Sequence, residues 1–429
     1  MTSRELARRV LERVEEGAYA TLALGGELTR ARTLSDADRG LATELVYGVL
    51  KRRARLDYAL AAGAPRGLGS LDARVLDCLR LGAYQILFLR VPAHAAVDDA
   101  VEAVKHARGA KLAGFANALL RKLARDGEPP PPDETDLVAH LSVVESAPAW
   151  LVNDALARFP PGEAKQFLAS LNTPAPVWLR ANTLKAQRDE VVARLREERP
   201  NATVSTSPLS PEALRVDGGG DPSRSRVFAE GLCTGQDLAA QLVARLVDPQ
   251  PGEALLDACA GVGGKSTHLA QLTGDRAQVD SADLSERKLE LGADLARRLG
   301  ITSLRPVVCD LTDENAPLQP DYDRILLDAP CTGLGVLRRH PEAKWRRAPG
   351  DARELAELQG QLLSALQGRV KPNGILVYSV CTYTDEEGPH QIRDFLAARP
   401  QFKLEETLQT WPHRDDADGF YAVRLRRIG

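Results

Sequence analysis

The second half of the chain alternates short apolar segments with amphipathic ones, and this alternation constrains its fold most strongly. From about residue 236 onward, six segments have the composition of strands: EALLDA, AQVDSAD, RPVVCD, YDRILLDAP, GILVYSVCT and GFYAVRLRR. Helical patterns separate most of them, and strands that alternate with helices favour a parallel, doubly wound α/β sheet. Ligands of such sheets bind at the carboxyl ends of the strands. We therefore predict an α/β domain over residues 236–429, with its functional site at those ends.

The first half of the chain is predicted to be mainly helical, with one clear interruption. Through residues 1–127, apolar side chains recur three and four positions apart, which predicts an all-α bundle. The four consecutive prolines at 129–132 cannot continue a helix, because proline lacks an N–H donor, and we interpret them as part of a linker. Residues 137–235 combine helical patterns with the strand-like segment PVWLRANTL, which predicts a small α+β domain.

The composition excludes several classes of protein. No uncharged apolar segment reaches the roughly 18 residues of a membrane span, and the charged N-terminal segment lacks the apolar stretch of a signal peptide. The six cysteines form no CxxC pair, so neither a metal site nor a disulfide scaffold is expected. We therefore predict a cytoplasmic protein that binds neither a membrane nor a metal, and we expect a monomer.

A glycine-rich segment follows the first predicted strand of the α/β domain. In DACAGVGGKSTH, residues 257–268, the triplet Gly264-Lys265-Ser266 resembles the end of a phosphate-binding P-loop, which would make the chain an NTPase. The P-loop pattern requires a glycine five residues before this triplet, where the chain has Cys259. A side chain at that position restricts the backbone that has to wrap a phosphate. The sequence therefore favours another use of the strand, turn and helix.

Acidic residues occur at the ends of four consecutive predicted strands. They are Asp257, Asp283, Asp310 and Asp328. Asp283 follows the glycine-rich turn at about the spacing that brings an acid to ribose hydroxyls in Rossmann-like domains. Such a row of carboxylates would repel a pyrophosphate, whereas it suits the sulfonium and ammonium cations of S-adenosylmethionine. The alternative is that each aspartate only caps the helix that follows it.

Two cysteines lie at the same predicted strand ends. Cys331 follows Asp328 by three residues in DAPCTGLGV, and Cys381 ends the next predicted strand in LVYSVCTYT. Each alone could be an ordinary core residue, but two of them beside an acidic cofactor site indicate thiol chemistry. Methylation of cytosine C5 requires such chemistry, because a thiolate that adds to C6 makes C5 nucleophilic.

Three segments in this order, DACAGVGGKSTH, DAPCTGLGV and VYSVCTY, resemble motifs of the RNA cytosine-5 methyltransferases. In the first half, ELVYGVLKRR, RLGAYQILFLRVPAHAAVDDAVE and GFANALLRKL are similar to the NusB-type RNA-binding domain that is fused to one branch of that family. The chain thus resembles the bacterial 16S rRNA methyltransferases of the RsmB/Sun/Fmu type over nearly its whole length. The resemblance implies a NusB-like helical bundle, a small α+β linker domain and a C-terminal Rossmann-like class I methyltransferase domain.

The resemblance also implies roles for individual residues. Cys381 would be the nucleophile, Cys331 would help to release the methylated product, and Asp328 would hydrogen-bond the cytosine ring. Asp283 would contact the ribose of S-adenosylmethionine, and Asp310 its adenine side. The complete set of cofactor-binding residues that it implies is Cys259, Ala260, Gly261, Val262, Gly263, Gly264, Lys265, Asp283, Asp310 and Asp328. The modified base would be the cytosine at conventional position 967 of 16S rRNA.

Two features depart from the pattern of that family. The loop usually reads Ala-Ala-Pro-Gly-Gly-Lys-Thr, and here Gly261 and Val262 replace Ala-Pro, which gives a more flexible turn. The nucleophile is usually preceded by threonine, and here it is preceded by Val380. Neither change removes a group with an implied catalytic role.

Basic side chains in two segments predict contacts with RNA phosphates. One segment, LRRHPEAKWRRAPGDAR, leaves the Cys331 motif and includes an indole that could stack on a base. The other lies on a predicted helix of the N-terminal bundle. The predicted RNA-binding residues are Lys51, Arg52, Arg53, Arg338, Arg339, Lys344, Trp345 and Arg346. Because the target base has to meet Cys381, we expect a flipped or unpaired cytosine.

The leading hypothesis from the sequence is an enzyme that methylates C5 of a cytosine in 16S rRNA. It would use S-adenosylmethionine and form a covalent bond between Cys381 and C6 of the base. The alternative is an RNA-binding or assembly module whose methyltransferase-like domain is inactive. The row of acids and the two thiols favour the enzyme.

Overall fold

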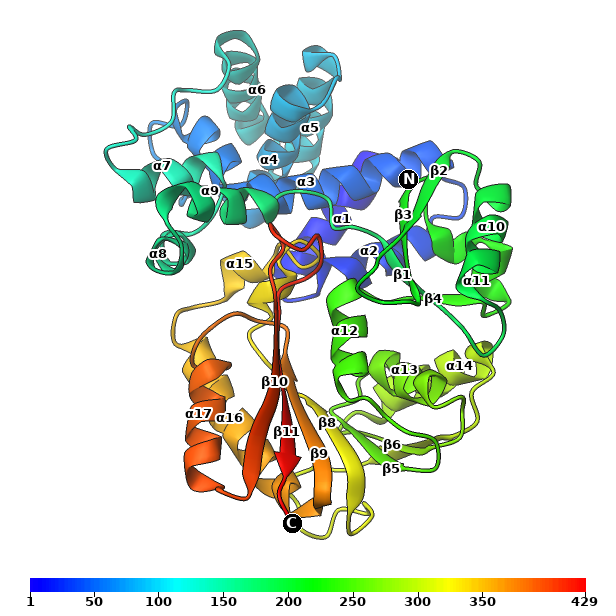
Figure 1. Ribbon diagram of the computed structural model, residues 1–429. Coiled ribbons are helices and arrows are strands. Elements are labelled where there is room, and N and C mark those ends of the chain that lie inside the picture. Colours follow the sequence, from blue (N-terminus) through cyan, green and yellow to red (C-terminus); the bar gives the residue numbers. More distant parts are fainter. The chain divides into compact units, whose positions relative to one another are not determined.

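The computed structural model describes residues 1–429, which divide into two compact units. Unit 1 comprises Met1–Pro174 together with Leu337–Arg347, and unit 2 comprises Ala175–Val336 together with Ala348–Gly429. Figure 1 labels most of the helices and strands of both units. A short segment from the second half of the sequence therefore belongs structurally to the first unit. None of the helices combines the length and the apolar character that crossing a membrane requires.

The N-terminal part of unit 1 is all helical, which confirms the predicted bundle. Its helices are α1 (Ser3–Glu15), α2 (Ala20–Arg30), α3 (Asp36–Ala61), α4 (Ala73–Phe88), α5 (Ala93–Arg108) and α6 (Ala110–Asp126). Leucine, valine and alanine side chains from one face of each helix form a common core. The first helix begins with a capping box, in which the side chains of Thr2 and Glu5 each bond the other residue's backbone N–H.

Three further helices and a short inserted one complete unit 1. They are α7 (Leu137–Val144), α8 (Ala149–Arg158), α9 (Pro161–Ser170) and α15 (Ala343–Arg346). The sequence predicts the first three as part of the small α+β domain, and their contacts join them to the bundle within unit 1. The backbone N–H of Ala54 donates to Ser146 Oγ at 3.0 Å, and Lys51 Nζ donates to the carbonyl of Thr173 at 2.7 Å. The two compact units divide after Pro174, and the domain bounds predicted from the sequence remain predictions.

Unit 2 begins with a small antiparallel sheet, which supplies the β part of the predicted α+β domain. The strand order is β2-β3-β1-β4. The elements are β1 (Trp178–Ala181), α10 (Arg188–Glu198), β2 (Ala202–Thr206), β3 (Ala213–Gly218), α11 (Arg226–Ala229) and β4 (Cys233–Gly235). Of these strands, the sequence predicted only the first, and the amphipathic helix matches the predicted RDEVVARLREE segment. Val191 and Leu195 of α10 pack on Leu179, Val204 and Leu214 of the sheet.

The large sheet of unit 2 is mixed, in the strand order β10-β11-β9-β8-β5-β6-β7. Its strands are β5 (Ala254–Ala258), β6 (Gln278–Asp283), β7 (Leu304–Val308), β8 (Tyr322–Asp328), β9 (Val370–Val380), β10 (Phe402–Thr410) and β11 (Phe420–Arg427). The strands from β5 to β9 pair in parallel, as predicted, but β10 and β11 are antiparallel to their neighbours. The prediction of a wholly parallel sheet is wrong for β11, and the edge strand β10 was not predicted.

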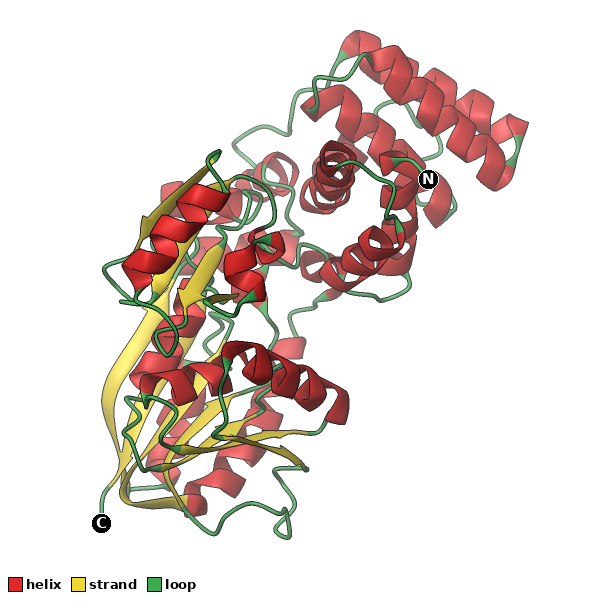
Figure 2. Ribbon diagram, turned by 90° about the vertical axis from the view of Figure 1, so that its right-hand side faces the viewer, coloured by secondary structure: helices red, strands yellow, loops and turns green.

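Helices cover both faces of the large sheet (Figures 1 and 2). On one face lie α12 (Leu238–Leu246), α13 (Gly264–Leu272) and α14 (Glu286–Leu299), and on the other lie α16 (Asp351–Leu366) and α17 (Pro389–Ala398). Successive residues of a strand pack alternately against the helices on one face and those on the other, because side chains alternate across a sheet. Leu255 and Leu326 pack in the first layer, and Leu256 and Leu327 pack in the second. The loops at the strand ends are left to form the site.

Candidate active site

The carboxyl ends of the parallel strands carry most of the predicted catalytic and cofactor-binding residues. Asp257 lies near the end of β5, Asp283 ends β6 and Asp328 ends β8. Cys381 directly follows β9, and Cys331 lies three residues beyond the end of β8. Because β6, β5, β8 and β9 are parallel neighbours, these residues lie along one edge of the sheet.

The thiols of Cys331 and Cys381 are in direct contact. Their Sγ atoms are 3.2 Å apart, and both residues are free cysteines at partly buried positions. The pKa of Cys331 is raised well above its usual value, first by its hydrogen bond with Cys381 and then by burial. Cys331 therefore holds its proton at neutral pH and can donate it toward the sulfur of Cys381.

Asp328 is held by two donors beside the thiols. Lys265 Nζ donates to one carboxylate oxygen at 2.6 Å, and Ser379 Oγ donates to the other at 2.9 Å. Burial acts to lower the pKa of Lys265, but the adjacent carboxylate of Asp328 outweighs it, and the pKa is raised. The ammonium therefore stays charged and is already engaged by a carboxylate. Since a P-loop lysine has to reach phosphate oxygens, this pairing disfavours the NTPase interpretation.

A pocket of about 330 Å³ lies between the glycine-rich loop, the start of α12 and the end of β8. Its lining residues are Gln236, Asp237, Ala240, Asp257, Cys259, Ala260, Gly261, Val262, Gly264, Lys265 and Asp328. Most of the loop that the sequence assigned to the cofactor thus lines one pocket. The walls contribute three carboxylates and a single ammonium group, so the pocket favours a ligand that carries positive charge.

Asp257 has an unused acceptor in this pocket. It is 1% exposed, and one carboxylate oxygen accepts a hydrogen bond from Ser266 Oγ at 2.5 Å. The other oxygen, Oδ1, is buried without any hydrogen-bond partner. Burial raises the pKa of Asp257 to about 7. Because buried polar atoms are nearly always paired in proteins, the unpaired oxygen indicates a place for a ligand donor.

The glycine-rich loop depends on an uncommon backbone conformation. Cys259, Gly261 and Gly263 have φ angles of 62°, 57° and 76°. A side chain at Gly263 would bring its Cβ to 3.0 Å from the Cα of Gly292 on α14, so only glycine allows this close approach. Cys259 adopts the left-handed region despite its side chain, so the restriction that the sequence analysis inferred there does not prevent the turn.

Two predicted cofactor contacts, Asp283 and Asp310, do not line this pocket. Asp283 is buried, and its carboxylate accepts hydrogen bonds from the backbone N–H groups of Gly261 at 3.0 Å and Ser285 at 2.9 Å. It therefore ties the end of β6 to the loop. Asp310 lies exposed beyond β7, where hydrogen bonds from the Thr312 side chain and N–H lower its pKa. Their predicted contacts with ribose and adenine remain predictions.

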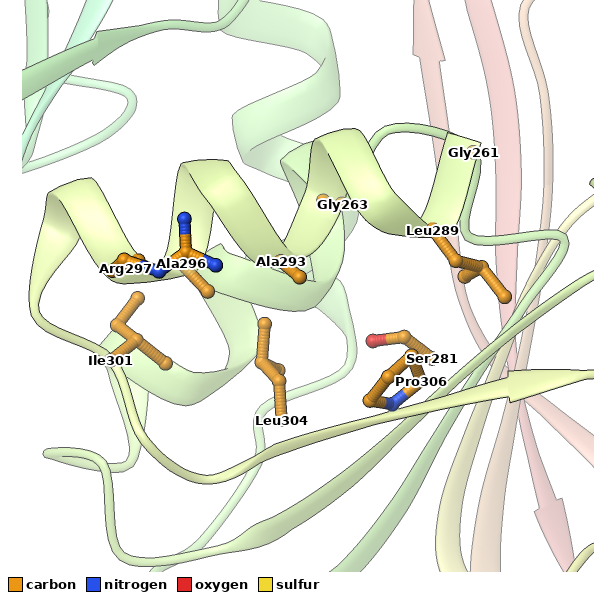
Figure 3. A pocket seen from close by; sticks show the side chains of 11 residues that line it. Gly261, Gly263, Ser281, Leu289, Ala293, Ala296, Arg297, Ile301, Leu304 and Pro306 are labelled. Carbon is orange, nitrogen blue, oxygen red and sulfur yellow. The ribbon is translucent and has the colours of Figure 1, made fainter. Parts of the chain in front are cut away.

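A second hollow, of about 210 Å³, lies beneath α14 (Figure 3). It is lined by Gly261, Gly263, Ser281, Leu289, Gly292, Ala293, Ala296, Arg297, Ile301, Leu304 and Pro306. These walls are mostly apolar, and no carboxylate is among them. The hollow therefore does not suit a cationic ligand, in contrast to the pocket that contains Asp257 and Asp328.

Arg180 on β1 supports the helix that follows the glycine-rich loop, and the sequence analysis missed it. Its guanidinium is fully buried and donates to the carbonyl of Gly264 at 2.9 Å and to Thr267 Oγ1 at 3.0 Å, both on α13. It also donates to the side chains of Gln236 at 2.6 Å and Gln271 at 3.1 Å. The available signal was a charged residue inside the apolar strand segment VWLRA, a position where arginine needs partners.

We expect the substitution Arg180→Met to destabilise unit 2 by about 2–4 kcal/mol, because it leaves several buried acceptors unpaired. Urea denaturation of the full chain would measure the loss, and hydrogen exchange of the α13 amides would locate it. The matched control is Arg287→Met, since Arg287 is exposed and pairs only with Glu290, three residues further along the same helix. Equal stability of the two variants would contradict a supporting role for Arg180.

The basic segment predicted to clamp RNA is seated on unit 1 in the structure. Lys344 is fully buried, and its Nζ donates to the carbonyls of Lys51 at 3.1 Å and Ser146 at 3.0 Å and to Asn172 Oδ1 at 3.0 Å. Burial lowers the pKa of Lys344 to about 7. This placement corrects the expectation for Lys344, because its ammonium has no open path to a phosphate.

Trp345 and Arg346 are engaged in the same way. Trp345 Nε1 donates to the carbonyl of Leu50 at 2.9 Å, and Arg346 donates to the carbonyl of Ala18, in the turn after α1, at 2.8 Å. Arg338 is buried, whereas Arg339 is half-buried. The segment therefore packs as part of unit 1, and its basic side chains, which the sequence analysis assigned to RNA, largely form hydrogen bonds within the protein.

The predicted basic cluster on α3 is also mostly engaged within unit 1. Lys51 is buried, with its ammonium on the Thr173 carbonyl, and burial lowers its pKa to about 8. Arg53 forms an ion pair with Glu15 at 3.0 Å. Arg52 is half-buried and lies over the ring of Phe88, 5.7 Å from its centre. A contact of this cluster with RNA stays a prediction.

A Rossmann-like domain whose pocket is lined by carboxylates, with two thiols at neighbouring strand ends, places the chain among the methyltransferases. Comparison with known proteins supports this assignment. The family model for the 16S rRNA methyltransferase RsmB/F matches residues 244–426. The NusB family matches residues 1–125, and the ferredoxin-like domain of RsmF/B-like methyltransferases matches residues 147–221.

Full-length relatives agree with the family models. The chain is 34% identical to the probable ribosomal RNA small subunit methyltransferase B of Bacillus subtilis, over 99% of both chains. It is also 34% identical to ribosomal RNA small subunit methyltransferase B of Klebsiella pneumoniae, over 98% of this chain and 97% of that one. Among solved structures, the protein PH0851 is similar with a TM-score of 0.85 and 26% identity, over 100% of this chain and 99% of that one. The chain therefore belongs to the RsmB/F family of 16S rRNA methyltransferases.

Proposed function

We propose that this chain methylates C5 of a cytosine in 16S rRNA through a covalent bond between Cys381 Sγ and C6 of the base. The observation that carries the proposal is the 3.2 Å contact between the Cys331 and Cys381 sulfurs, next to Asp328. A family member that methylated an exocyclic nitrogen or a ribose oxygen would need no thiol, because those atoms are nucleophilic on their own. Two thiols in contact suit a carbon that has to be activated covalently.

The pocket fits S-adenosylmethionine, which supplies an electrophilic methyl group. Its ammonium and sulfonium cations match the three carboxylates in the wall, and the unpaired oxygen of Asp257 can accept from the ammonium group. The residues that would hold the cofactor are those of the loop from Cys259 to Lys265 together with Asp328. Asp283 and Asp310, at the neighbouring strand ends, would complete the site.

The protein's own groups then have separate tasks. Cys381 adds to C6, and the electron pair of the C5–C6 double bond shifts so that C5 becomes nucleophilic. Asp328 accepts a hydrogen bond from the exocyclic amino group of cytosine and holds the ring. After methyl transfer, Cys331 gives up its own proton to solvent and, as a thiolate, takes the proton from C5. The C5–C6 double bond then re-forms and Cys381 leaves as a thiolate.

The substrate of this proposal is an unpaired or flipped cytosine, and position 967 of 16S rRNA is the candidate. A base inside a helical stack could not bring C6 to a sulfur at the edge of the sheet. The NusB-family domain would bind the RNA around the target. A monomeric state and a cytoplasmic location remain predictions of the same proposal.

Bisulfite sequencing of 16S rRNA from cells that lack the protein tests the proposal directly. We expect one cytosine to lose its protection against deamination and to regain it when the wild-type chain is restored. Purified protein should methylate the same cytosine in a 16S rRNA transcript or a ribosomal particle. An unchanged bisulfite pattern, together with methylation at a nitrogen or a ribose oxygen, would contradict the proposal.

The pKa of Asp257 predicts how binding of S-adenosylmethionine depends on pH. Burial holds this pKa at about 7, so the carboxyl is mostly protonated at pH 6 and mostly ionised at pH 8. A cationic ligand favours the ionised form, and its affinity should therefore increase by about tenfold from pH 6 to pH 8. Isothermal titration calorimetry would measure this change.

The control is Asp257→Asn, which keeps the size of the side chain and removes its titration. We expect weaker binding in this variant, with only the pH dependence that belongs to the ligand and to other groups. The same pH profile in both proteins would exclude Asp257 as the cause. No binding by the wild-type chain at any pH would favour the alternative of an inactive, RNA-binding module.

A further inference from the structure

Glu387 is a completely buried carboxylate between Cys381 and α17, at 0% exposure. Its Oε1 accepts hydrogen bonds from the backbone N–H of Thr332 at 2.8 Å and from Gln359 Nε2 at 3.2 Å. Its Oε2 accepts from Thr332 Oγ1 at 2.6 Å and from Thr384 Oγ1 at 2.7 Å. All four donors belong to neutral groups. Burial of a carboxylate without a cation is costly, and these four bonds are what offsets the cost here.

The donors belong to the two loops that carry the thiols. Thr332 directly follows Cys331, and Thr384 lies three residues after Cys381. Glu387 therefore joins the loop after β8 to the loop after β9 through one side chain.

Neighbouring groups strengthen the same connection. Gln359 on α16 also donates to the carbonyl of Pro330 at 2.8 Å, so the residues on both sides of Cys331 are held. The hydroxyls of Thr332 and Thr382, which follow the two cysteines, are 2.9 Å apart. Since the Thr332 hydroxyl already donates its hydrogen bond to Glu387, the Thr382 hydroxyl is the donor in the bond between the two threonines.

We propose that Glu387 is a positioning residue that keeps the sulfurs of Cys331 and Cys381 in contact by locking the two loops together. Glu387 touches neither sulfur and acts through Thr332 and Thr384. The contact distance of 3.2 Å lets one thiol donate to the other, and a shift of about 1 Å in such a geometry can cost roughly 100-fold in rate. The expected loss of methylation rate rests on the proposed function, whereas the expected loss of contact between the two sulfurs does not.

The substitutions Glu387→Ala and Glu387→Gln should differ in kcat while the Kd for S-adenosylmethionine stays the same. A residue that only stabilised the fold would not be expected to give this difference. Glu387→Ala removes both acceptor oxygens, and with them all four hydrogen bonds, and frees both loops. Glu387→Gln keeps the shape and the Oε1 acceptor for the Thr332 N–H, and the two threonine hydroxyls can rotate to accept from the new NH₂ group. We expect kcat to fall about 100-fold in the alanine variant and less than about 10-fold in the glutamine variant, with an unchanged Kd for S-adenosylmethionine.

A dithiol reagent tests the geometry without RNA or cofactor. Phenylarsine oxide reacts with two neighbouring thiols, forms two As–S bonds and releases one molecule of water. The wild-type chain should bind one arsenical with loss of two thiols, and Cys331→Ala should lose this reaction. We expect Glu387→Ala to capture the arsenical at least 10-fold more slowly and Glu387→Gln to lie between it and the wild type.

The matched control is Glu386→Ala, since Glu386 is the preceding residue and is only partly buried. If Glu387→Ala fails to fold, Thr332→Val takes its place. This variant removes one of the hydroxyls bound to Glu387 and keeps the backbone N–H. It should slow arsenical capture at least threefold. Wild-type rates of capture and methylation in these variants would overturn the proposal. If the wild-type chain does not methylate cytosine C5, the proposed function fails, while the capture experiment still decides the role of Glu387.

Discussion

Replacement of Cys381 by serine should reduce methylation of 16S rRNA by at least about 10⁴-fold, the scale of loss expected when a catalytic nucleophile is removed. Serine is nearly the same size, but its hydroxyl is far less acidic and is a poor nucleophile toward C6 of cytosine. Transfer of labelled methyl groups from S-adenosylmethionine to a 16S rRNA transcript would measure the effect. Binding of the cofactor should persist, because Cys381 does not line the pocket that contains Asp257.

Cys309→Ser provides the comparison for this experiment. Cys309 lies beyond β7 and, like Cys381, is a partly buried free cysteine. Its replacement should change activity by no more than about twofold, as expected for a substitution away from the reacting groups. Full activity in Cys381→Ser, with loss of activity in the corresponding Cys331 variant, would reverse the roles assigned to the two thiols.

Replacement of Cys331 by alanine should have a different result: a covalent complex between protein and RNA that accumulates. Cys381 can still add to C6 in this variant, but the group that removes the C5 proton is missing, so the adduct cannot break down. The first cause of the raised pKa of Cys331 is its hydrogen bond with Cys381. Once that sulfur is bonded to carbon, this contribution is reduced, and Cys331 ionises more readily at the step where its thiolate has to accept the C5 proton.

Denaturing gel electrophoresis would detect the adduct as a band of lower mobility that disappears after treatment with ribonuclease. The double variant Cys331→Ala with Cys381→Ser should form no such band, which assigns the bond to Cys381. A Cys331→Ala enzyme that turns over at the wild-type rate would show that another group removes the proton.

Local patterns in the sequence were sufficient for the elements that build the site. Strands β5, β6, β8 and β9 were predicted because each is a short apolar segment, and the aspartate or cysteine at its end is adjacent in sequence. The parallel order followed from the helices between them, since parallel strands need a crossover connection. For the same reason, the family motifs could be recognised without any knowledge of long-range contacts.

The edge of the large sheet was harder to predict. Strand β10 has the sequence FKLEETLQT, and most of its side chains are exposed, so it lacks the apolar composition of a buried strand. Charged residues are common on edge strands, where they discourage pairing with other chains. The antiparallel direction of β11 was also missed, because a strand's own composition does not specify the direction of its neighbour.

The placement of the basic segment of residues 337–347 could not be predicted from composition. Its arginines and lysine are typical of an exposed surface that binds phosphates, and we interpreted them in that way. In the structure, Lys344 is buried because three acceptors, on Lys51, Ser146 and Asn172, converge on its ammonium. These acceptors come from distant parts of the sequence, so no local sequence pattern predicts them.

The amino-acid sequence by itself determined which groups stand at the strand ends: the glycine-rich loop, the four aspartates and the two thiols. It could do so because hydrophobic periodicity and turn residues act over a few neighbouring positions. Only the tertiary structure decided that the two sulfurs touch, that Glu387 bonds the loops that carry them and that Arg180 supports α13. Those contacts join residues up to about 90 positions apart, and they exist only after the sheet and its covering helices have packed.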